Sequence, residues 1–450
     1  MPKRSRGPVR SSRQLALDLL QRWRGGEGFA ADLMTDAFAQ TPPPAPRDRA
    51  LVQNMFYGVL RQLRLLDHWI GELRPTGRLG ADERDLLRLG LCQVLVLGMP
   101  DHAAVDTTVA CAGRARGLVN AVLRRAIRER GRLLEDAAQS PPALRWSHPD
   151  WLFERWNRQF GRDAADALCQ WNQQPAPVWL RLNRLAPPAP PAGSGSTEAD
   201  WPDEVRQAVA TGAPAVDLAT LLGPLGRDFA PVDRLPRDAL DAGLVYAQDP
   251  STAAACRLLD PQPGDTVIDG CAAPGGKTAL LWQLMERRGR LVACDLAPQR
   301  LQRLGDNLSR LGAGEVELRA VDWTAPGAVS AELPPADRLL LDVPCSNTGV
   351  MRRRIDVRWR LDPGQFTELQ ALQLAIVAGG LRRLRTGGIL VYSTCSLDAE
   401  ENEQVVQQLP RRHPGLTLEQ VHATRPWLDR VDGSFAARFV WHGPAAGTGV

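Results

Sequence analysis

The sequence lacks long hydrophobic runs. No apolar stretch in its 450 residues approaches the roughly 20 residues that a membrane-spanning helix needs, so we expect no membrane segment. The basic start, residues 1–12, is followed by no hydrophobic core of the kind that an export signal has. We therefore expect a cytoplasmic protein.

The sequence also lacks paired cysteines. Its eight cysteines are spread along the chain, with no CxxC pair and no His/Cys cluster. This distribution is typical of reduced thiols rather than of a disulfide framework, and it indicates no metal site. Five of the cysteines are interpreted as small buried hydrophobic side chains: Cys92, Cys111, Cys169, Cys256 and Cys294.

The net charge of the chain is small, but the charged residues are unevenly distributed along the sequence. The net charge is only +4, yet the first 150 residues hold 23 Lys and Arg against 16 Asp and Glu. A basic surplus of this kind favours a surface that faces nucleic acid, and solvated arginine-rich helices would give the same count. Charge alone leaves both interpretations open.

The first 140 residues predict an all-α domain. Apolar residues recur three and four positions apart, which is the helical period. The predicted helices cover residues 13–23, 49–70, 83–98 and 117–134. Proline pairs at 41–46 and 140–149 interrupt them, because proline removes a backbone donor.

The remainder of the chain predicts an α/β fold. Two short helices at 150–160 and 163–172 precede a strand at 178–183 and a Pro/Gly/Ser-rich stretch at 186–200, which we expect to be a flexible loop. Beyond Tyr246, strands alternate with helices, as in a doubly wound sheet. The predicted strands cover residues 265–269, 289–295, 315–322, 337–342 and 387–394.

Polar residues follow these predicted strands, where ligands bind in open α/β sheets. The first strand leads into "DGCAAPGGKT" (269–278), whose glycines let the backbone approach a ligand closely. Asp295 ends the second strand, where an acid typically holds a ribose hydroxyl pair, and Asp322 ends the third. The fourth leads into "DVPCS" (342–346) and the fifth into "TCS" (394–396). We expect one site at this sheet edge.

Two other functions are conceivable for the glycine loop. A P-loop NTPase needs four residues between its glycines, whereas five separate Gly270 from Gly276, and Pro274 removes an amide donor. The "LLLD" at 339–342 could nevertheless pass for a Walker B strand. A dinucleotide oxidoreductase would show G-x-G-x-x-G after the first strand, and this chain does not. Neither function explains cysteines at two strand ends.

The motifs "DGCAAPGGKT", "LDVPCSNTG" and "VYSTCSLDAEENE" closely resemble those of the NOL/NOP/Sun family of RNA 5-cytosine methyltransferases. The stretch "RGLVNAVLRR" resembles the NusB-like RNA-binding domain that precedes the catalytic domain in members that act on small-subunit ribosomal RNA. The resemblance implies a NusB-like helical domain at 1–140, linker helices and a small RNA-recognition subdomain at 141–240, and a Rossmann-like methyltransferase domain at 241–450.

The resemblance implies S-adenosylmethionine as cofactor, RNA as partner and no metal, and we expect a monomer. Asp295 would hold the ribose hydroxyls, Asp322 the adenine side, and Asp342 would lie between cofactor and base. The methionine and ribose part would lie against the glycine loop, formed by Cys271, Ala272, Ala273, Pro274, Gly275, Gly276 and Lys277. Gly270 and Val343 depart from the family pattern, which often has an apolar residue and alanine there.

Cytosine chemistry explains the two cysteines. C5 of cytosine is a poor nucleophile until a thiolate adds to C6, and a second group must then assist release. In the family the TCS cysteine attacks and the PCS cysteine assists, so the resemblance implies Cys395 as nucleophile and Cys345 as helper. Asp342 is placed to stabilise the protonated adduct. Transfer RNA as substrate and an inactive RNA-binding assembly factor remain alternatives.

Two further features point to this site. Lys3 and Lys277 are the only lysines in a chain that otherwise uses arginine. We therefore expect position 277 to require a compact ammonium group, near either the methionine carboxylate or Asp342. The basic run "MRRRIDVRWR" (351–360) follows the first of the two cysteines and is interpreted as a phosphate clamp, although a solvated loop would look the same.

Overall fold

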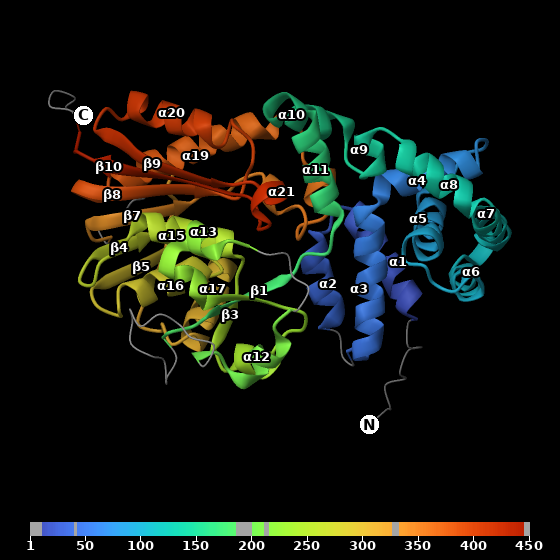
Figure 1. The fold of residues 1–450 in the computed structure, drawn as a ribbon, viewed down its shortest axis with the longest axis horizontal. Helices are drawn as coiled ribbons and strands as arrows, with labels where there is room; N and C mark the ends of the chain where they lie inside the picture. Colours follow the sequence, from blue (N-terminus) through green and yellow to red (C-terminus); the bar gives the residue numbers. More distant parts are fainter. Residues whose placement is uncertain (1–10, 40–42, 186–199, 211–215, 326–332, 445–450) are drawn as a thin grey trace. The chain divides into compact units, whose positions relative to one another are not determined.

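The computed structural model describes residues 11–39, 43–185, 200–210, 216–325 and 333–444 (Figure 1). The chain divides into two compact units. Unit 1 comprises Met1–Gln174 and Met351–Arg360, and unit 2 comprises Pro175–Val350 and Leu361–Val450. No helix in the described ranges is long and apolar enough to cross a membrane. The loop expected at 186–200 lies, except for its last residue, outside the described residues.

Unit 1 is helical, as the sequence predicts. Its described longer helices are α1 (Ser12–Arg24), α2 (Ala30–Phe38), α3 (Pro46–Arg61), α4 (Leu63–Leu73), α5 (Ala81–Leu91), α6 (Asp101–Ala110), α7 (Arg116–Arg128), α8 (Arg130–Gln139), α10 (Asp150–Phe160) and α11 (Arg162–Gln173). The described part of unit 1 also contains the four-residue helices α9 (Pro142–Arg145) and α18 (Val357–Arg360), the π-helix η1 (Cys92–Val96) and the 3-10 helix η2 (Gly113–Ala115). All of the predicted helical stretches are therefore helical.

Two of the predicted helices are each a pair of helices. The stretch at 49–70 breaks at Gln62, where φ is −108° and ψ is 18°, and the stretch at 117–134 breaks at Glu129, where φ is −98° and ψ is 10°. Apolar periodicity continues through both breaks, so the sequence could not reveal them. The faces of the helices still meet in one core, which includes Phe56, Leu87 and Val119.

The segment Met351–Arg360 is built into unit 1, although it follows the PCS motif in sequence. Ile355 is 3% exposed and packs in the helical core. One carboxylate oxygen of Asp356 accepts hydrogen bonds from the backbone N–H of Ala30 at 2.8 Å and from Nε1 of Trp23 at 3.2 Å. The carboxylate thus caps the first turn of α2, whose own N-cap residue, Phe29, supplies no side-chain bond.

The phosphate-clamp hypothesis for this segment is wrong for its buried arginines. Arg358 is fully buried and donates to the carbonyls of Asn172, at 3.2 Å, and Met351. Arg352 is 6% exposed, and its guanidinium lies 3.9 Å from the ring centroid of Trp171. These side chains hold the segment inside unit 1. The hypothesis failed because the number of charges in a sequence does not reveal which arginines are buried.

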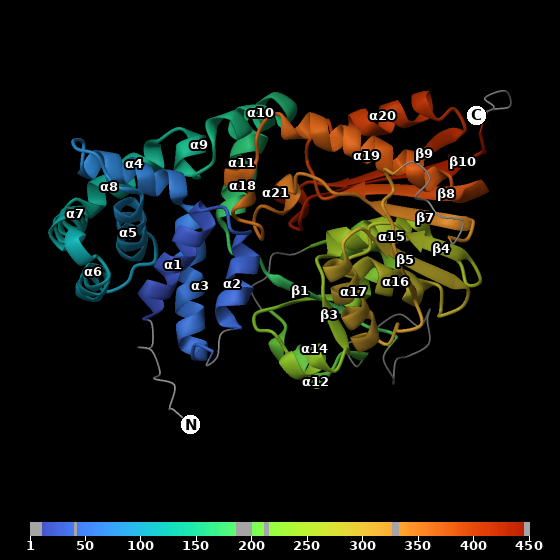
Figure 2. The same ribbon diagram turned by 180° about the vertical axis from the view of Figure 1, so that it is seen from behind.

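Unit 2 contains a seven-stranded mixed sheet with the order β6-β5-β4-β7-β8-β10-β9 (Figure 2). Its strands are β4 (Thr266–Asp269), β5 (Arg290–Asp295), β6 (Glu317–Ala320), β7 (Ala336–Asp342), β8 (Leu384–Thr394), β9 (Leu416–Thr424) and β10 (Ser434–Trp441). The first five pair in parallel and confirm the five predicted strands. Strands β9 and β10 pair antiparallel and were not predicted.

Helices cover both faces of this sheet. Val267 and Leu340 pack on one side, against α15 (Ala253–Leu259), α16 (Gly276–Leu284) and α17 (Pro298–Arg310). Ile268 and Leu339 pack on the other, against α19 (Gln365–Leu381) and α20 (Glu403–Arg412). Alternate residues of each strand therefore enter opposite cores, which explains why these strands read as continuous apolar runs.

A small antiparallel sheet contacts the end of the glycine loop. It has the order β2-β1-β3, with β1 (Val178–Leu182), β2 (Phe229–Val232) and β3 (Val245–Ala247). Arg181 of β1 is fully buried and donates to Gln248, Gln283 and, at 3.4 Å, the carbonyl of Gly276. The small sheet thus contacts the first turn of α16.

Candidate active site

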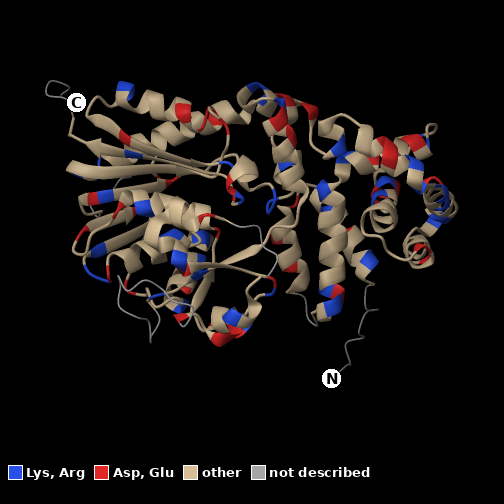
Figure 3. Ribbon diagram, viewed as in Figure 1, with Lys and Arg blue, Asp and Glu red and all other residues tan. Residues whose placement is uncertain are grey.

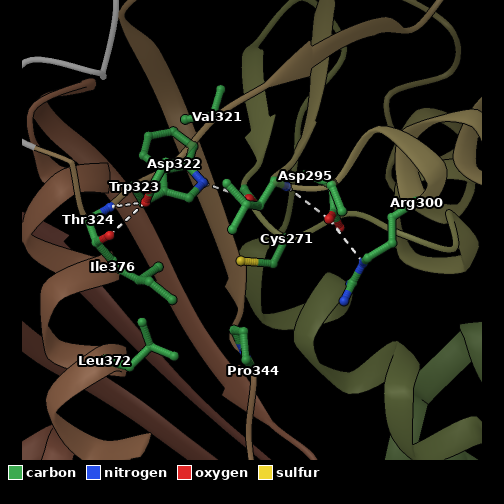
Figure 4. A pocket seen from close by; sticks show the side chains of 13 residues that line it. Cys271, Asp295, Arg300, Val321, Asp322, Trp323, Thr324, Pro344, Leu372 and Ile376 are labelled. Atoms are coloured by element: carbon green, nitrogen blue, oxygen red, sulfur yellow. Dashed lines mark hydrogen bonds and ion pairs between the residues drawn. The ribbon is translucent and has the colours of Figure 1, made fainter. Parts of the chain in front are cut away.

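A pocket of about 260 Å³ opens at the carboxyl ends of β4, β5 and β6 (Figure 4). Its walls combine carboxylates with apolar side chains. The lining residues that carry the argument are Cys271, Asp295, Asp322, Trp323, Leu372 and Ile376. A flat apolar ring and a pair of hydroxyl groups are what such walls can bind.

Asp295 lies on one side of the pocket, at the end of β5 (Figure 4). It is 5% exposed, and its carboxylate accepts hydrogen bonds from the backbone N–H of Ala273 at 3.1 Å and of Leu296 at 2.9 Å. Arg300 Nε lies 3.0 Å from its Oδ1. These donors fix the carboxylate where a ribose diol could share it.

Asp322 and Trp323 form the other side (Figure 4). Asp322 Oδ1 accepts from the N–H of Thr324 at 2.9 Å and from its hydroxyl at 2.6 Å, and these bonds lower the pKa of Asp322. The indole of Trp323 donates to the carbonyl of Gly270 at 2.6 Å. A Cβ at residue 270 would lie 2.4 Å from Leu341, so packing accounts for the glycine that departs from the family pattern.

The glycine loop turns from β4 into α16, and only Cys271 of its seven predicted cofactor-binding residues lines the pocket. Gly275 has φ of +106°, a conformation that favours glycine. A Cβ at Gly276 would lie 2.6 Å from the ring of Tyr246. Ala272 is buried and bonds the carbonyl of Cys294 through its N–H at 2.8 Å. The loop therefore shapes the pocket through its backbone.

The ammonium of Lys277 contacts Asp342, one of the two partners expected for it. Nζ lies 2.7 Å from Oδ2 of Asp342, and Oδ1 of Asp342 accepts from the hydroxyl of Ser393 at 2.7 Å. Burial would lower the pKa of Lys277, but the charge of Asp342 and its hydrogen bond raise it overall. The two contacts hold the carboxylate in one orientation.

The two strand-end cysteines meet. Sγ of Cys345 lies 3.3 Å from Sγ of Cys395, and the thiol of Cys395 is also 3.3 Å from Oδ1 of Asn347. The hydrogen bond with Cys395, burial, and the charges of Cys395 and Glu401 raise the pKa of Cys345 well above its ordinary value. Cys345 therefore keeps its proton, and Pro344 beside it lines the pocket.

Asp269, the first residue of the glycine motif, is a buried acid. It is 1% exposed, its Oδ2 accepts from the hydroxyl of Thr278 at 2.7 Å, and no described group bonds its Oδ1. Burial raises the pKa of Asp269 to about 7, and the charge of Asp342 adds to this. The acid thus titrates near neutral pH.

The remaining cysteines have packing roles. Cys92, Cys169, Cys256 and Cys294 are fully buried, and Cys111 is half-buried in unit 1. Burial raises the pKa of Cys92 and of Cys256 to about 12, so neither thiol supplies a thiolate at neutral pH. No group of three or more His, Cys, Asp or Glu within the described ranges could hold a metal ion.

Sequence reasoning missed most of the pocket wall. Trp323, Leu372 and Ile376 belong to a loop and to α19, which carry no motif of their own. It also missed Ser393, although its position inside "VYSTCS" was the available signal. These residues reach the site only through the folding of distant segments.

Comparison with known protein families matches three parts of the chain. The 16S rRNA methyltransferase RsmB/F family matches residues 256–442. The NusB family matches residues 10–128, and an RsmF/B-like ferredoxin-like domain matches residues 148–187.

Curated relatives match nearly the whole chain. "Probable ribosomal RNA small subunit methyltransferase B" of Synechocystis sp. is 34% identical over 427 residues, which cover 92% of each protein. "Ribosomal RNA small subunit methyltransferase B" of Yersinia pseudotuberculosis is 34% identical over 411 residues, 88% of this chain and 91% of that protein.

Solved structures share the fold. The crystal structure of PH0851 has a TM-score of 0.72 at 22% identity and covers 97% of this chain and 100% of its own. A methyltransferase homolog protein from Pyrococcus horikoshii has a TM-score of 0.54 at 27% identity and covers 66% of this chain and 97% of its own. The chain belongs to the ribosomal RNA small subunit methyltransferase B family, so it is an RNA methyltransferase whose cofactor is S-adenosylmethionine.

Proposed function

We propose that the chain methylates C5 of a cytosine in small-subunit ribosomal RNA through a covalent adduct between cysteine and C6. The observation that carries this proposal is the pair of thiols 3.3 Å apart, beside a carboxylate held by Lys277 and Ser393. Methyl transfer to an oxygen or an exocyclic nitrogen would need no thiol, whereas the C5 reaction needs one to activate the ring and a second group to release it.

The proposed cofactor site is the pocket lined by Pro344, the residue before Cys345. Asp295 would hold the ribose hydroxyls, and the apolar wall formed by Trp323, Leu372 and Ile376 would receive the adenine, with Asp322 at its edge. Cys271 to Lys277 would enclose the remaining part of the cofactor through the backbone of the loop. S-adenosylmethionine supplies the electrophilic methyl group.

Each cysteine has one proposed role. The thiolate of Cys395 adds to C6 of the cytosine, the C5=C6 electron pair shifts to form a C4=C5 enamine, and N3 takes a proton from solvent. C5 of this enamine would then take the methyl group, and the sulfonium donor would leave as its neutral thioether. Asp342 accepts a hydrogen bond from N3–H or the amino group of the ring and stabilises the charged adduct. A base then removes the C5 proton, the C6–S bond breaks, the double bond re-forms and the Cys395 thiolate is regenerated.

Cys345 is the proposed helper in that release. The assignment follows the family pattern, in which the cysteine of the PCS motif assists release, and the neighbouring Cys395 thiol and burial raise the pKa of Cys345. Assistance by Cys345 then requires that it loses its proton to solvent before it accepts the C5 proton. Both transfers leave the enzyme in its starting state.

The described helical part of unit 1 and the small sheet around β1 are the proposed RNA-binding elements. We assign RNA binding to the helical domain at 1–140 and RNA recognition to the subdomain at 141–240, with catalysis in the domain at 241–450. The NusB match over 10–128 and the basic surplus of residues 1–150 support this division. We also propose that the protein works in the cytoplasm as a monomer.

The test is methylation of defined RNAs by the purified chain with a labelled methyl donor, followed by digestion to nucleosides. We expect label in 5-methylcytidine from small-subunit ribosomal RNA, and none with Cys395→Ala. Cys111→Ala, which changes a thiol in unit 1, is the matched control and should be fully active. Label in another nucleoside would contradict the C5 chemistry.

The choice of RNA separates the alternatives. Label confined to transfer RNA would favour that substrate instead. RNA binding with no label in ribosomal RNA, ribosomal particles or transfer RNA would favour an inactive assembly factor.

A further inference from the structure

A buried carboxylate, Glu401, lies between the turns that carry the two thiols. Glu401 is fully buried, in the turn that precedes α20. Its Oε2 accepts a hydrogen bond from the backbone N–H of Ser346 at 2.9 Å, and its Oε1 accepts from the hydroxyl of Ser396 at 2.6 Å. The hydroxyl of Ser346 donates to Oε1 as well. Each serine directly follows one of the cysteines, so one side chain joins both turns.

The amide of Gln373 completes this arrangement from α19. Its Nε2 donates to Oε2 of Glu401 at 2.9 Å and to the carbonyl of Pro344 at 3.0 Å. The peptide groups on both sides of Cys345 are therefore held by the pair Glu401 and Gln373. Residues 343–347 form neither helix nor strand, so no regular backbone pairing fixes Cys345 directly. Side-chain hydrogen bonds do so instead.

The burial of this charge is costly without a cation. Within the described ranges, Glu401 forms no ion pair with Lys, Arg or His, and its partners are two hydroxyls, a backbone N–H and an amide. A buried carboxylate is tolerated when such donors satisfy it, yet a neutral side chain would cost less. The buried carboxylate therefore depends on these four donors.

We propose that Glu401 is a positioning residue for methyl transfer: its carboxylate holds the Cys345 turn against the Cys395 turn and keeps the helper thiol in place beside the nucleophile. The proposal rests on the proposed function, in which these two thiols are the reacting groups.

The charge has a second consequence for Cys345. The groups that face this thiol are Cys395, Glu401 and Tyr392, whose own pKa is raised by burial and by the charges of Glu401 and Cys345. All of these neighbours are negative when ionised, and the charges of Cys395 and Glu401 raise the pKa of Cys345. The carboxylate thus favours the protonated helper.

Glu401→Gln tests the charge with little change in shape. The amide oxygen can take the place of Oε2, facing Ser346 N–H and Gln373, and its NH2 can donate to the two serine hydroxyls after they rotate. Glu403→Gln makes the same substitution two positions further on, at an exposed residue of α20, and is the matched control. We expect Glu401→Gln to lower kcat by about 10- to 100-fold, because misplaced reacting groups cost that much, with KM for S-adenosylmethionine within about twofold.

A second readout is independent of methyl transfer. Iodoacetamide labelling of Cys345, followed by mass spectrometry over a pH series, should occur at lower pH in Glu401→Gln than in Glu403→Gln. This readout applies even if the substrate is not cytosine, so failure of the proposed function and failure of this inference are distinguishable. An identical kcat and an identical labelling profile in the two variants would overturn the proposal.

Ser346→Ala is the second variant if Glu401→Gln does not fold. It removes one hydroxyl donor and leaves the carboxylate and its bond to Ser346 N–H in place. We expect a loss of kcat in the same direction, and no loss would contradict the positioning role.

Discussion

The ammonium of Lys277 lies 2.7 Å from the carboxylate of Asp342, and the hydroxyl of Ser393 holds the other oxygen of that carboxylate. The three residues come from the glycine loop, from the end of β7 and from the end of β8. Because parallel strands bring their carboxyl ends to one edge, residues as far apart in sequence as Lys277 and Ser393 contact the same carboxylate. Asp342 is thereby oriented before any substrate binds.

Replacement of this lysine by an apolar residue should destabilise the fold. Lys277→Met leaves the Asp342 carboxylate with one partner, and we expect a loss of about 1–3 kcal/mol in the free energy of unfolding, since Asp342 is partly open to solvent. The double variant Lys277→Met/Asp342→Asn should recover part of this loss. Urea denaturation of the two single variants and the double variant gives the coupling, and additive effects would show that the pair is not coupled.

Asp269 should make stability depend on pH. Its pKa is about 7 in the folded protein and near 3.9 in an unfolded chain, so the folded state binds more protons between these values and stability falls as pH rises through that range. Asp269→Asn removes this effect. We expect the variant to equal the wild type near pH 4 and to exceed it by about 4 kcal/mol near pH 8. Denaturant unfolding at both pH values checks this, and a constant difference would refute it.

Asp356 should stabilise unit 1 although it lies far from it in sequence. Asp356→Ala removes the cap of α2 and leaves the N–H of Ala30 and Nε1 of Trp23 without their acceptor, so we expect a loss of about 1–3 kcal/mol. Asp362→Ala, which changes an exposed aspartate, is the control. Thermal unfolding followed by tryptophan fluorescence reports the difference, and equal midpoints would contradict the capping role.

The basic helices of unit 1 should set the salt dependence of RNA binding. Figure 3 marks the Lys and Arg positions, and four exposed arginines gather at and before α7: Arg114, Arg116, Arg124 and Arg128. Their replacement by Gln should flatten the slope of log K against log salt by about 2 to 3, because each phosphate contact contributes about 0.7. Cofactor affinity should be unchanged. The same slope as the wild type would show that this charge is ordinary solvated surface.

Substitution is a better test here than deletion. Removal of residues 1–140 would uncover Ile355, which packs in the helical core, and would leave the buried Arg358 in a changed environment. Loss of activity in such a fragment would therefore not report on RNA binding.

The sequence predicted the parts of the fold that repeat a local pattern. The five parallel strands alternate between two cores, and the helices of unit 1 bury one face each, so both classes leave a periodic signal. The antiparallel strands β9 and β10 were not predicted, because the exposed face of β9 dilutes its apolar content. The breaks at Gln62 and Glu129 leave no signal, since apolar spacing continues through them.

The residues of the candidate site also form two groups, one that the sequence could predict and one that it could not. Asp295, Asp322, Asp342, Cys345 and Cys395 follow predicted strands, and the rule that strand ends meet brings them to one edge. Trp323, Ile376 and Glu401 depend on how a loop, a helix and a turn pack against that edge, which periodicity does not encode. The position of Met351–Arg360 in unit 1 depends on burial, and the sequence shows only its charge.

The trapping of a covalent RNA adduct tests the central claim most directly. Cys345→Ala should retain attack and methyl transfer but slow release, so that protein bound to methylated RNA accumulates and survives a denaturing gel. Cys395→Ala should give neither adduct nor methylation. A target that is already single-stranded should trap more readily, because the base must leave any helix to reach the thiols. An adduct with Cys395→Ala and none with Cys345→Ala would reverse the two roles, and no adduct with either variant in the presence of active wild type would contradict the covalent mechanism.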